Sequence, residues 1–210
     1  MNIVVIAPHP DDEAIGCGGT ICLHVGRGDR VVAIFLTSGE LGLKHLPREE
    51  AWRVREREAA AAAKVMGLAA LTFLRQPDWF VGDELETAAT VLRPILEREE
   101  PRFVYLPHAN EWHPDHRAAL SIVYAALRDS ARVAPILRTY EVWTPLSEYD
   151  HVEDITAVMA RKLRAIRCYR SQRGEFAYDR AVLGLNQYRG ALAGGCRYSE
   201  VFQESPGTAA

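Results

Sequence analysis

The chain has 210 residues, of which 48% are hydrophobic, 25% charged and 9% aromatic. This composition is typical of a globular domain with one substantial core, and it excludes an intrinsically disordered chain. The 25 basic and 28 acidic side chains leave a formal net charge of −3, so the chain lacks the basic excess of a protein that binds nucleic acid through phosphate contacts. We therefore expect no nucleic-acid partner.

The sequence predicts neither a membrane span nor an export signal. Its longest apolar stretches are interrupted by His24 and by Arg75 before they reach the roughly 18 residues that a span needs. Residues 1–6 lack the basic region and the small-residue cleavage site of a signal peptide. The four cysteines show no Cys-x-x-Cys spacing, so we interpret them as reduced residues of a cytoplasmic protein. A homo-oligomer is compatible with this interpretation.

Short apolar runs rich in β-branched residues predict strands at residues 2–7, 30–37, 71–74, 102–106 and 138–142. Apolar side chains at helical spacing predict helices at residues 47–66, 85–98, 119–127 and 153–168. Alternating strands and helices predict a single Rossmann-like α/β domain, with a mainly parallel sheet and helices on both faces. We expect this domain to span residues 1–204 and to end in a loose tail over residues 205–210.

Polar side chains follow the first and the fourth predicted strands. The first strand runs into Pro8-His9-Pro10-Asp11-Asp12-Glu13, and the fourth is followed by His108 and then by His113-Pro114-Asp115-His116. In the common strand order 3-2-1-4-5 these two strands are neighbours, and ligands bind beyond their carboxyl ends. We therefore expect the two clusters to meet in one site.

The combined cluster has the composition of a catalytic metal site. Two histidines and one carboxylate leave a position open for water on zinc, and the same ligand set suits Fe(II). After three ligands are taken, at least one Asp and one His remain as a base and an oxyanion donor for hydrolysis. Taken alone, the acids would also suit a helix start, and His113 a solvated loop. Their combination at neighbouring strand ends favours the metal site.

Two further features have local interpretations. The glycines of residues 16–19 lack the G-x-G-x-x-G spacing of a dinucleotide site, so we interpret them as positions of close helix packing. Trp79, Trp112 and Tyr169 are candidates to stack on a sugar face, although aromatic residues near strand ends are more often packing residues.

At these residues the sequence closely resembles the LmbE-like, or PIG-L, family of zinc-dependent N-acetylglucosaminyl deacetylases. The resemblance rests on residues 8–13 with the Gly16-Cys17-Gly18-Gly19-Thr20 that follows them, and on residues 113–116. Weaker similarities extend it over most of the chain, at residues 37–40, Arg55 with Glu58 and Gly67, residues 169–172 and residues 198–202.

The resemblance implies a role for each matched residue. The family pattern makes the zinc ligands His9, Asp12 and His116. Asp11 matches the general base, and His113 matches a histidine that stabilises the oxyanion and is a candidate to protonate the leaving amine. Asp115 matches the acid that tunes this histidine. Because residues two apart do not face each other on a helix, that pair requires His113 to lie outside the helix. Arg55 matches a substrate-contacting arginine, or else lies on a solvated helix face.

The resemblance implies a zinc-dependent hydrolase that acts on a small-molecule amino-sugar conjugate. Metal-bound water attacks the amide carbonyl and releases an N-acetyl group from an N-acetylglucosamine-type derivative. Three alternatives stay open from the sequence: an amidase of the same family acting on a non-acetyl or thiol-conjugate amide, a non-catalytic metal-dependent carbohydrate-binding domain, and an Fe(II) oxygenase. The binding domain is disfavoured because binding alone requires neither Asp11 nor His113.

Overall fold

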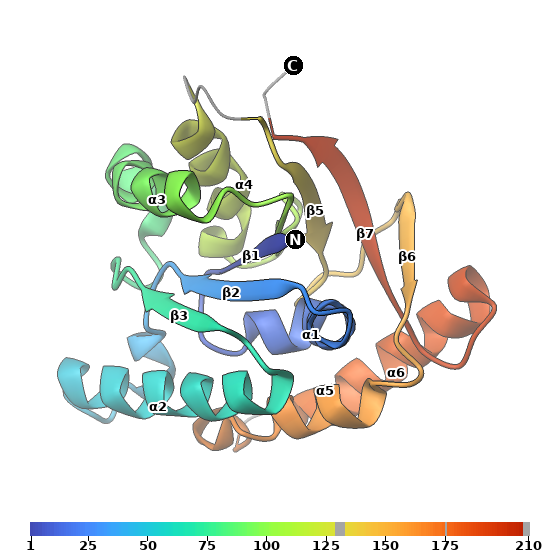
Figure 1. Cartoon of the computed structure of the whole chain (residues 1–210). Helices are drawn as coiled ribbons and strands as arrows, with labels where there is room; N and C mark the ends of the chain where they lie inside the picture. Colours follow the sequence, from blue (N-terminus) through green and yellow to red (C-terminus); the bar gives the residue numbers. More distant parts are fainter. Residues whose placement is uncertain (129–132, 175, 208–210) are drawn as a thin grey trace.

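The computed structural model describes residues 1–128, 133–174 and 176–207. They form a seven-stranded sheet in the order β3-β2-β1-β4-β5-β7-β6, with helices on both faces (Figure 1). The parallel strands are β1 (Asn2–Ala7), β2 (Arg30–Phe35), β3 (Ala70–Phe73), β4 (Phe103–Pro107) and β5 (Ile136–Tyr140). Their order is the predicted 3-2-1-4-5, so the mainly parallel α/β fold is confirmed.

The sheet continues beyond β5 with two antiparallel strands. β7 (Ser199–Pro206) pairs with β5, and β6 (His151–Asp154) pairs with β7. Ser205 lies opposite Leu137 in this ladder and Pro206 opposite Ile136, so the loose tail predicted from residue 205 does not begin there. The backbone of these two residues is used to extend the sheet. Residues 208–210, the end of the predicted tail, lie outside the described residues.

The helix predicted over residues 153–168 is shorter than expected. Its first part is strand β6, and α5 spans only Met159–Ile166. The backbone N–H of Ile155 donates to the carbonyl of Tyr198 at 3.0 Å, which keeps this residue at the end of the antiparallel pairing. Ile155 and Val158 have helical spacing because both pack into the same core, and this pattern hid the strand.

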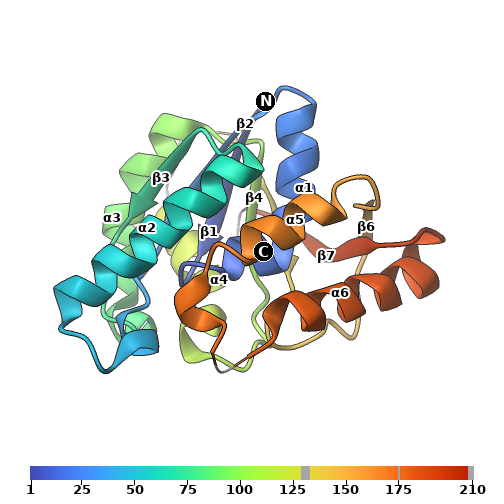
Figure 2. The same ribbon diagram turned by 90° about the horizontal axis from the view of Figure 1, so that it is seen from below.

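Six α-helices of the described chain cover the sheet. One face carries α1 (Asp12–Gly26), α2 (Arg48–Met66), α5 and α6 (Tyr178–Arg189), and the other carries α3 (Leu85–Glu99) and α4 (Pro114–Leu127). Figure 2 shows α2, α5 and α6 lying across the first face. Four short helical segments connect them, namely η1 (Glu40–Leu43), η2 (Val81–Glu84), η3 (Arg170–Gln172) and η4 (Gly190–Gly194).

The central strand β1 shows why the core has two halves. Successive side chains of a strand point to opposite faces of the sheet. Ile3 and Val5 accordingly pack in the core under α1, α2 and α5, whereas Val4 and Ile6 pack in the core under α3 and α4. All four side chains are buried. This continuous apolar run places the end of β1 rigidly at the centre of the sheet's carboxyl edge.

Helix α1 is interrupted and packs very closely against its neighbours. Cys17 has non-helical angles, with φ of −134°. A Cβ atom at Gly16 would lie 2.1 Å from the ring of Tyr140, and one at Gly19 would lie 2.6 Å from Ile155. These distances are shorter than any real carbon contact, so only glycine permits the packing. The predicted role of these glycines in close packing is confirmed.

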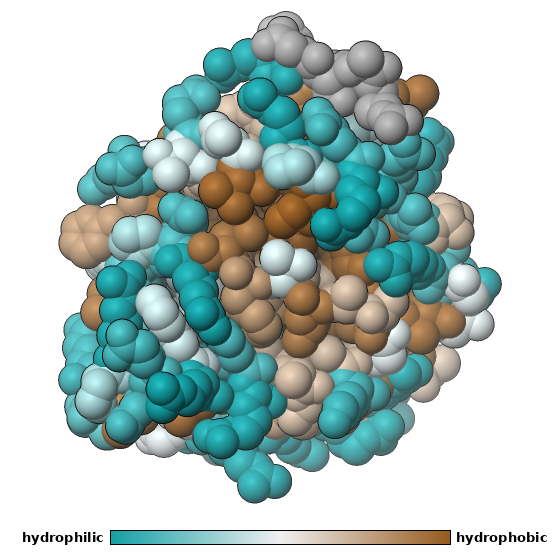
Figure 3. All heavy atoms as spheres, turned by 60° about the vertical axis from the view of Figure 1, so that its left-hand side comes forward, coloured by the Kyte–Doolittle hydropathy of each residue, from teal (hydrophilic) through white to brown (hydrophobic). Residues whose placement is uncertain are grey.

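The face of the molecule on the β3 side carries an apolar patch. Figure 3 looks toward the β3 side and shows apolar side chains gathered in the middle of that face, ringed by hydrophilic ones. β3 is an edge strand, and its Leu71 and Phe73 are half-buried.

All four cysteines are free, two of them buried. Within the described residues, each helix is too short or too polar to cross a membrane.

Candidate active site and metal centre

The two polar clusters of the sequence meet at the carboxyl edge of the sheet. β1 and β4 pair directly in parallel, with Val4 opposite Val104, so the loops that follow these two strands emerge side by side. The first loop leads into α1 and the second into α4. Across them, Nδ1 of His9 lies 3.2 Å from Nε2 of His116. The predicted meeting of the two clusters is therefore found in the fold.

Three donor atoms converge closely enough to share one cation. Oδ2 of Asp12 lies 3.3 Å from Nδ1 of His9 and 3.1 Å from Nε2 of His116. A tetrahedron with ligand bonds of about 2.0 to 2.1 Å has edges of about 3.3 to 3.4 Å, so the three distances match one face of such a tetrahedron. His113 lies close enough to both histidines to form an alternative group. The donor set fits a divalent metal with a position left open.

Carboxylates stand behind the imidazole of His9. Its Nε2 lies 3.1 Å from Oδ2 of Asp115 and 3.2 Å from Oδ1 of Asp78. Burial disfavours a charge on His9, but hydrogen bonds with Asp115, Asp12 and Asp78 outweigh it and hold the pKa of His9 well above its ordinary value. A carboxylate on the second nitrogen fixes the ring and its tautomer, as is usual for a metal-binding histidine.

A similar arrangement stands behind His116. Oε2 of Glu111 lies 3.7 Å from Nδ1 of His116, and the Glu111 carboxylate is held in place by backbone N–H groups of residues 142–144. Burial disfavours a charge on His116, but Asp12 and Glu111 outweigh it and raise its pKa. Each of the two histidines that face Asp12 therefore has an acid on its far side.

Asp78 and Glu111 belong to the site, and the sequence analysis missed both. Asp78 is buried in the loop after β3, and Glu111 is buried in the loop after β4. A signal was available for each, because both loops leave the carboxyl edge at which ligands bind in this fold. For Glu111 the signal was stronger, since it stands two residues before His113 in the same loop.

The backbone at Asp11 is held in an unusual conformation. Its φ is 128°, a value that costs strain in a residue with a side chain. Two buried side chains hold it: Glu13 accepts the N–H of Asp11 at 3.1 Å, and Arg55 donates to the carbonyl of Pro10. Burial raises the pKa of the Asp11 carboxyl to about 6, although the nearby charge of Arg55 opposes this. Asp11 thus lies in the cleft wall as a carboxylate that can exchange a proton near neutral pH.

His113 is the N-cap residue of α4 and lies outside the helix, with φ of −76° and ψ of 134°. Its Nδ1 accepts the backbone N–H of Asp115 at 3.2 Å, so a neutral ring carries its proton on Nε2. Burial lowers the pKa of His113 to about 4, and the charges of His9 and His116 add to this effect. The side chain is therefore a neutral hydrogen-bond donor at pH 7.

The carboxylate of Asp115 contacts groups other than the His113 ring. It accepts the backbone N–H of Trp79 at 2.7 Å and of Val81 at 3.2 Å, and it lies against His9. The hydrogen bond between Asp115 and His113 runs through the backbone N–H instead. The predicted requirement that His113 lie outside the helix is met, while the tuning role suggested for Asp115 stays a prediction.

Arg55 lies within the site and not on a solvated helix face. The residue is only 2% exposed, and its Nη2 lies 3.4 Å from Oδ2 of Asp11. Within the described residues, Nε and Nη1 of Arg55 are buried without a hydrogen-bond partner. Two nitrogens of this buried guanidinium, which carry three N–H groups, are therefore unpaired in the wall of the site.

A cleft of about 1040 Å³ opens over these groups, a volume at the upper end for small-molecule sites. His9, Asp11, Asp12, Arg55 and His113 all line it. Its rim carries exposed aromatic side chains, at Trp79, Phe80, Trp112, Trp143 and Phe176.

Tyr169 differs from the other aromatic candidates, because it is buried and donates its hydroxyl hydrogen bond to Glu13. It therefore supports the Asp11 loop, and only Trp79 and Trp112 of the three candidates stand at the rim.

Comparison with known proteins agrees with the geometry. The family model described as PIG-L, GlcNAc-PI de-N-acetylase, matches residues 4–127. The diacetylchitobiose deacetylase of Thermococcus kodakarensis is 30% identical over 225 residues, which cover 98% of this chain and 84% of that protein. Both names describe deacetylases, which are amide hydrolases.

Two solved structures share the fold over nearly the whole chain. The N,N'-diacetylchitobiose deacetylase of Pyrococcus horikoshii, in complex with an inhibitor, has a TM-score of 0.85 at 27% identity and covers 98% of this chain and 84% of that one. A conserved protein of Thermus thermophilus has a TM-score of 0.81 at 31% identity, covering 96% and 93%. The chain therefore belongs to the PIG-L, or LmbE-like, family of deacetylases.

Proposed function

We propose that this protein is a zinc-dependent hydrolase that removes the N-acetyl group from an N-acetylglucosamine-type amino-sugar derivative. The observation that carries the proposal is the convergence of His9, Asp12 and His116, with Asp11 and His113 left uncommitted beside them. A site that only bound a sugar would need neither of the two remaining groups. The diacetylchitobiose deacetylases supply the substrate class, because both act on an N-acetylated amino sugar.

His9, Asp12 and His116 would hold the metal through the three donor atoms that face one another. When bound, zinc acts as a Lewis acid that polarises a carbonyl and brings the pKa of water to about 7. Two histidines and one carboxylate also suit Fe(II), so the experiment below compares both metals. Asp115, Asp78 and Glu111 keep the two imidazoles oriented toward the shared position.

Asp11 acts as the general base in this proposal. With a pKa of about 6, its carboxylate is mostly ionised at neutral pH and accepts a proton from water as the water attacks the amide. The strained backbone at this residue is fixed by Glu13 and Arg55, so the carboxylate needs no rearrangement before the reaction. The same group is suited to return the proton to the leaving amine.

His113 stabilises the charge that develops on the acetyl oxygen. Its Nε2–H is a fixed donor because Nδ1 is already occupied by a backbone N–H, and its low pKa keeps the ring neutral. A donor oriented before the reaction stabilises an oxyanion without reorganisation. Arg55 lines the cleft beside Asp11, so its guanidinium is suited to contact an oxygen of the sugar, and the aromatic rim packs against the sugar ring.

The test is a panel of N-acetylated and N-acylated glucosamine conjugates, including thiol conjugates, with detection of both the free amine and the released acid. The protein is stripped of metal, reloaded with Zn²⁺ or with Fe²⁺ under anaerobic conditions, and analysed for metal. We expect acetate release with the zinc-loaded protein. Asp11→Asn is the matched control, because it keeps the side-chain volume but does not accept a proton, and it should lose at least 100-fold in turnover.

Absence of acetate with every metal would contradict the proposal, and so would an Asp11→Asn variant with full activity. Release of a longer acid, or cleavage only of thiol conjugates, would move the protein to the related amidase activity. Cytoplasmic location and a homo-oligomeric state stay predictions of the sequence.

A further inference from the structure

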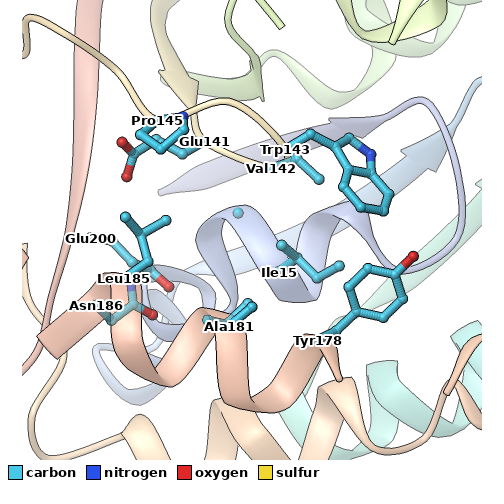
Figure 4. Close-up of a pocket in the computed structure, with 12 residues that line it drawn as sticks. Ile15, Glu141, Val142, Trp143, Pro145, Tyr178, Ala181, Leu185, Asn186 and Glu200 are labelled. Atoms are coloured by element: carbon cyan, nitrogen blue, oxygen red, sulfur yellow. The ribbon is translucent and has the colours of Figure 1, made fainter. Parts of the chain in front are cut away.

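A second cavity lies beside the catalytic cleft, between α1, α6 and the segment that follows β5 (Figure 4). Its volume is about 260 Å³. Its apolar walls include Ile15 of α1, Ala181 and Leu185 of α6, and Val142 and Trp143 after β5. None of the proposed metal ligands lies in this lining, and neither do Asp11, His113 and Arg55.

The surface of the cavity is almost entirely apolar. Its two carboxylates and one amide stand at one end, as Figure 4 shows, and each has a partner within the protein. Glu141 pairs with Arg189, Asn186 accepts from Lys162 at 2.9 Å, and Glu200 pairs with Lys162 at 2.6 Å. These polar groups are already hydrogen-bonded within the protein. An apolar group that enters the cavity therefore leaves none of them unpaired.

The cavity is next to the reacting centre. Trp143 and Tyr178 line both the cavity and the catalytic cleft, and their rings pack edge to face with centroids 5.4 Å apart. Figure 4 shows this aromatic pair at the end of the cavity opposite the acids. Ile15 of the cavity follows Asp12 of the cleft by three residues on α1, which is less than one helical turn of about 5.4 Å. The cavity and the cleft therefore share an aromatic wall, and a substrate bound in the cleft lies next to the cavity.

The size of the cavity indicates how much it can hold. A dry, apolar protein cavity of about 150 Å³ is enough to bind benzene, and this cavity is larger. A chain of about six carbons or a single ring is therefore a suitable occupant. The aliphatic walls from α1 and α6 and the two rings shared with the cleft match that chemistry.

We propose that this cavity is a subsite for an apolar substituent of the amino-sugar substrate. The substituent is an alkyl or aryl group of about six carbons, carried either on the aglycone or as a longer N-acyl chain. The proposal rests on the proposed deacylase function, since the sugar and its amide must occupy the adjacent cleft. It assigns the protein to substrates that join an amino sugar to an apolar group.

The experiment compares chain lengths in two series. The first series runs from methyl to hexyl glycosides of N-acetylglucosamine, and the second from N-acetyl to N-hexanoyl glucosamine. Each methylene that becomes buried raises kcat/KM by up to about fourfold. We expect at least a tenfold rise over one of the series. A rise in the glycosides places the aglycone in the cavity, and a rise in the N-acyl series places the acyl chain there.

Ala181→Phe fills the cavity from α6 and should remove the dependence on chain length. Gln187→Phe is the matched control, because it adds the same side chain to the same helix at an exposed position outside the cavity. The control should keep the full rise over the series. A slope that persists in Ala181→Phe, or that disappears equally in Gln187→Phe, would overturn the proposal.

Failure of the subsite and failure of the proposed function give different results. If the methyl glycoside is hydrolysed and kcat/KM does not change with chain length in either series, the subsite is overturned and the deacetylase function stands. If no compound is hydrolysed, the deacetylase function fails, and calorimetric binding of the hexyl and methyl glycosides still decides the subsite. Tighter binding of the hexyl compound in the native protein, lost in Ala181→Phe, supports it, and equal binding of the two compounds contradicts it.

Discussion

Two buried polar clusters contact α1, and they are built on opposite plans. In the ion-pair cluster, Lys162 lies 2.6 Å from Glu200 and 2.9 Å from Asn186, and Glu200 also accepts the N–H groups of Gly19 and Thr20 at 2.8 Å. These N–H groups follow the non-helical Cys17. The cluster therefore closes the break in the helix and is complete within the protein.

The catalytic cluster at the start of α1 is incomplete by comparison. Five acids, Asp11, Asp12, Asp78, Glu111 and Asp115, crowd around three imidazoles. Two buried nitrogens of Arg55 have no hydrogen-bond partner in the part of the chain that the structure describes. Closed polar networks stabilise a fold, whereas unpaired buried groups cost free energy. The difference indicates that the first cluster serves the fold and that the second is completed by a metal and a substrate.

The variant with the largest expected effect is Asp12→Ala, which tests whether the catalytic cluster binds a metal. Asp12 is 2% exposed and faces both His9 and His116, so its removal should abolish metal binding and lower turnover by more than about 1000-fold. Metal analysis and an acetate-release assay measure the two effects. Thr20→Val on the same helix is the control, since it removes a hydrogen bond to Glu200 in the other cluster and should keep the metal. Retention of one metal per Asp12→Ala chain would show that the assigned ligand set is incorrect.

Lys162→Met tests the other half of the comparison. It leaves Glu200 buried without its counter-charge, which should lower the free energy of unfolding by about 3 to 5 kcal/mol. Urea denaturation measures the change, and metal content should stay the same. Adding Glu200→Gln to this variant should restore part of the loss. A loss below about 1 kcal/mol would mean that the ion-pair cluster does not hold the fold in the way that its geometry indicates.

His113→Ala distinguishes a donor from a ligand inside the catalytic cluster. Loss of an oxyanion donor typically costs about 100- to 1000-fold in turnover, so we expect that decrease with metal content unchanged. The same purified sample serves for steady-state kinetics and for metal analysis. Loss of the metal would place His113 in the ligand group that it can form with His9 and His116, and full activity would remove it from the mechanism.

A smaller effect concerns pH and only the catalytic cluster. Burial would lower the pKa of His9 and His116, but neighbouring carboxylates outweigh it and raise the pKa of both. In the metal-free protein these rings therefore hold protons that a metal must displace. Metal affinity should therefore fall as pH decreases, by about tenfold per pH unit for each displaced proton. Calorimetry in buffers of different ionisation enthalpy counts the protons. An affinity that stays constant between pH 6 and 8 would contradict this linkage.

The parallel half of the fold was predictable because its strands are apolar runs bounded by breakers. The antiparallel half was not. β6 and β7 contain polar residues such as His151 and Glu204, and pairing with β5, far away in the sequence, decides their structure. The apolar spacing of Ile155 and Val158 indicated a longer helix. Both side chains pack into the same core, although Ile155 follows a strand.

The candidate site was partly visible in the sequence. Chemistry and strand order predicted that the two short motifs would meet, and the family resemblance then singled out His9, Asp12 and His116 as ligands. Asp78 and Glu111 stand alone in loops, and only the three-dimensional structure shows that their carboxylates face the two imidazoles. The strain at Asp11 was also invisible, because it depends on Glu13, which accepts the N–H of Asp11, and on Arg55, which donates to the carbonyl of Pro10.

The left-handed backbone at Asp11 links the stability of the protein to its catalytic activity. Glycine adopts a φ of 128° without strain, so Asp11→Gly should release about 1 kcal/mol of backbone strain. The same change removes the carboxylate that faces the buried Arg55 and, in the proposed mechanism, the proton acceptor. A catalyst of this family that is engineered for heat resistance would therefore have to be screened for turnover whenever this position changes.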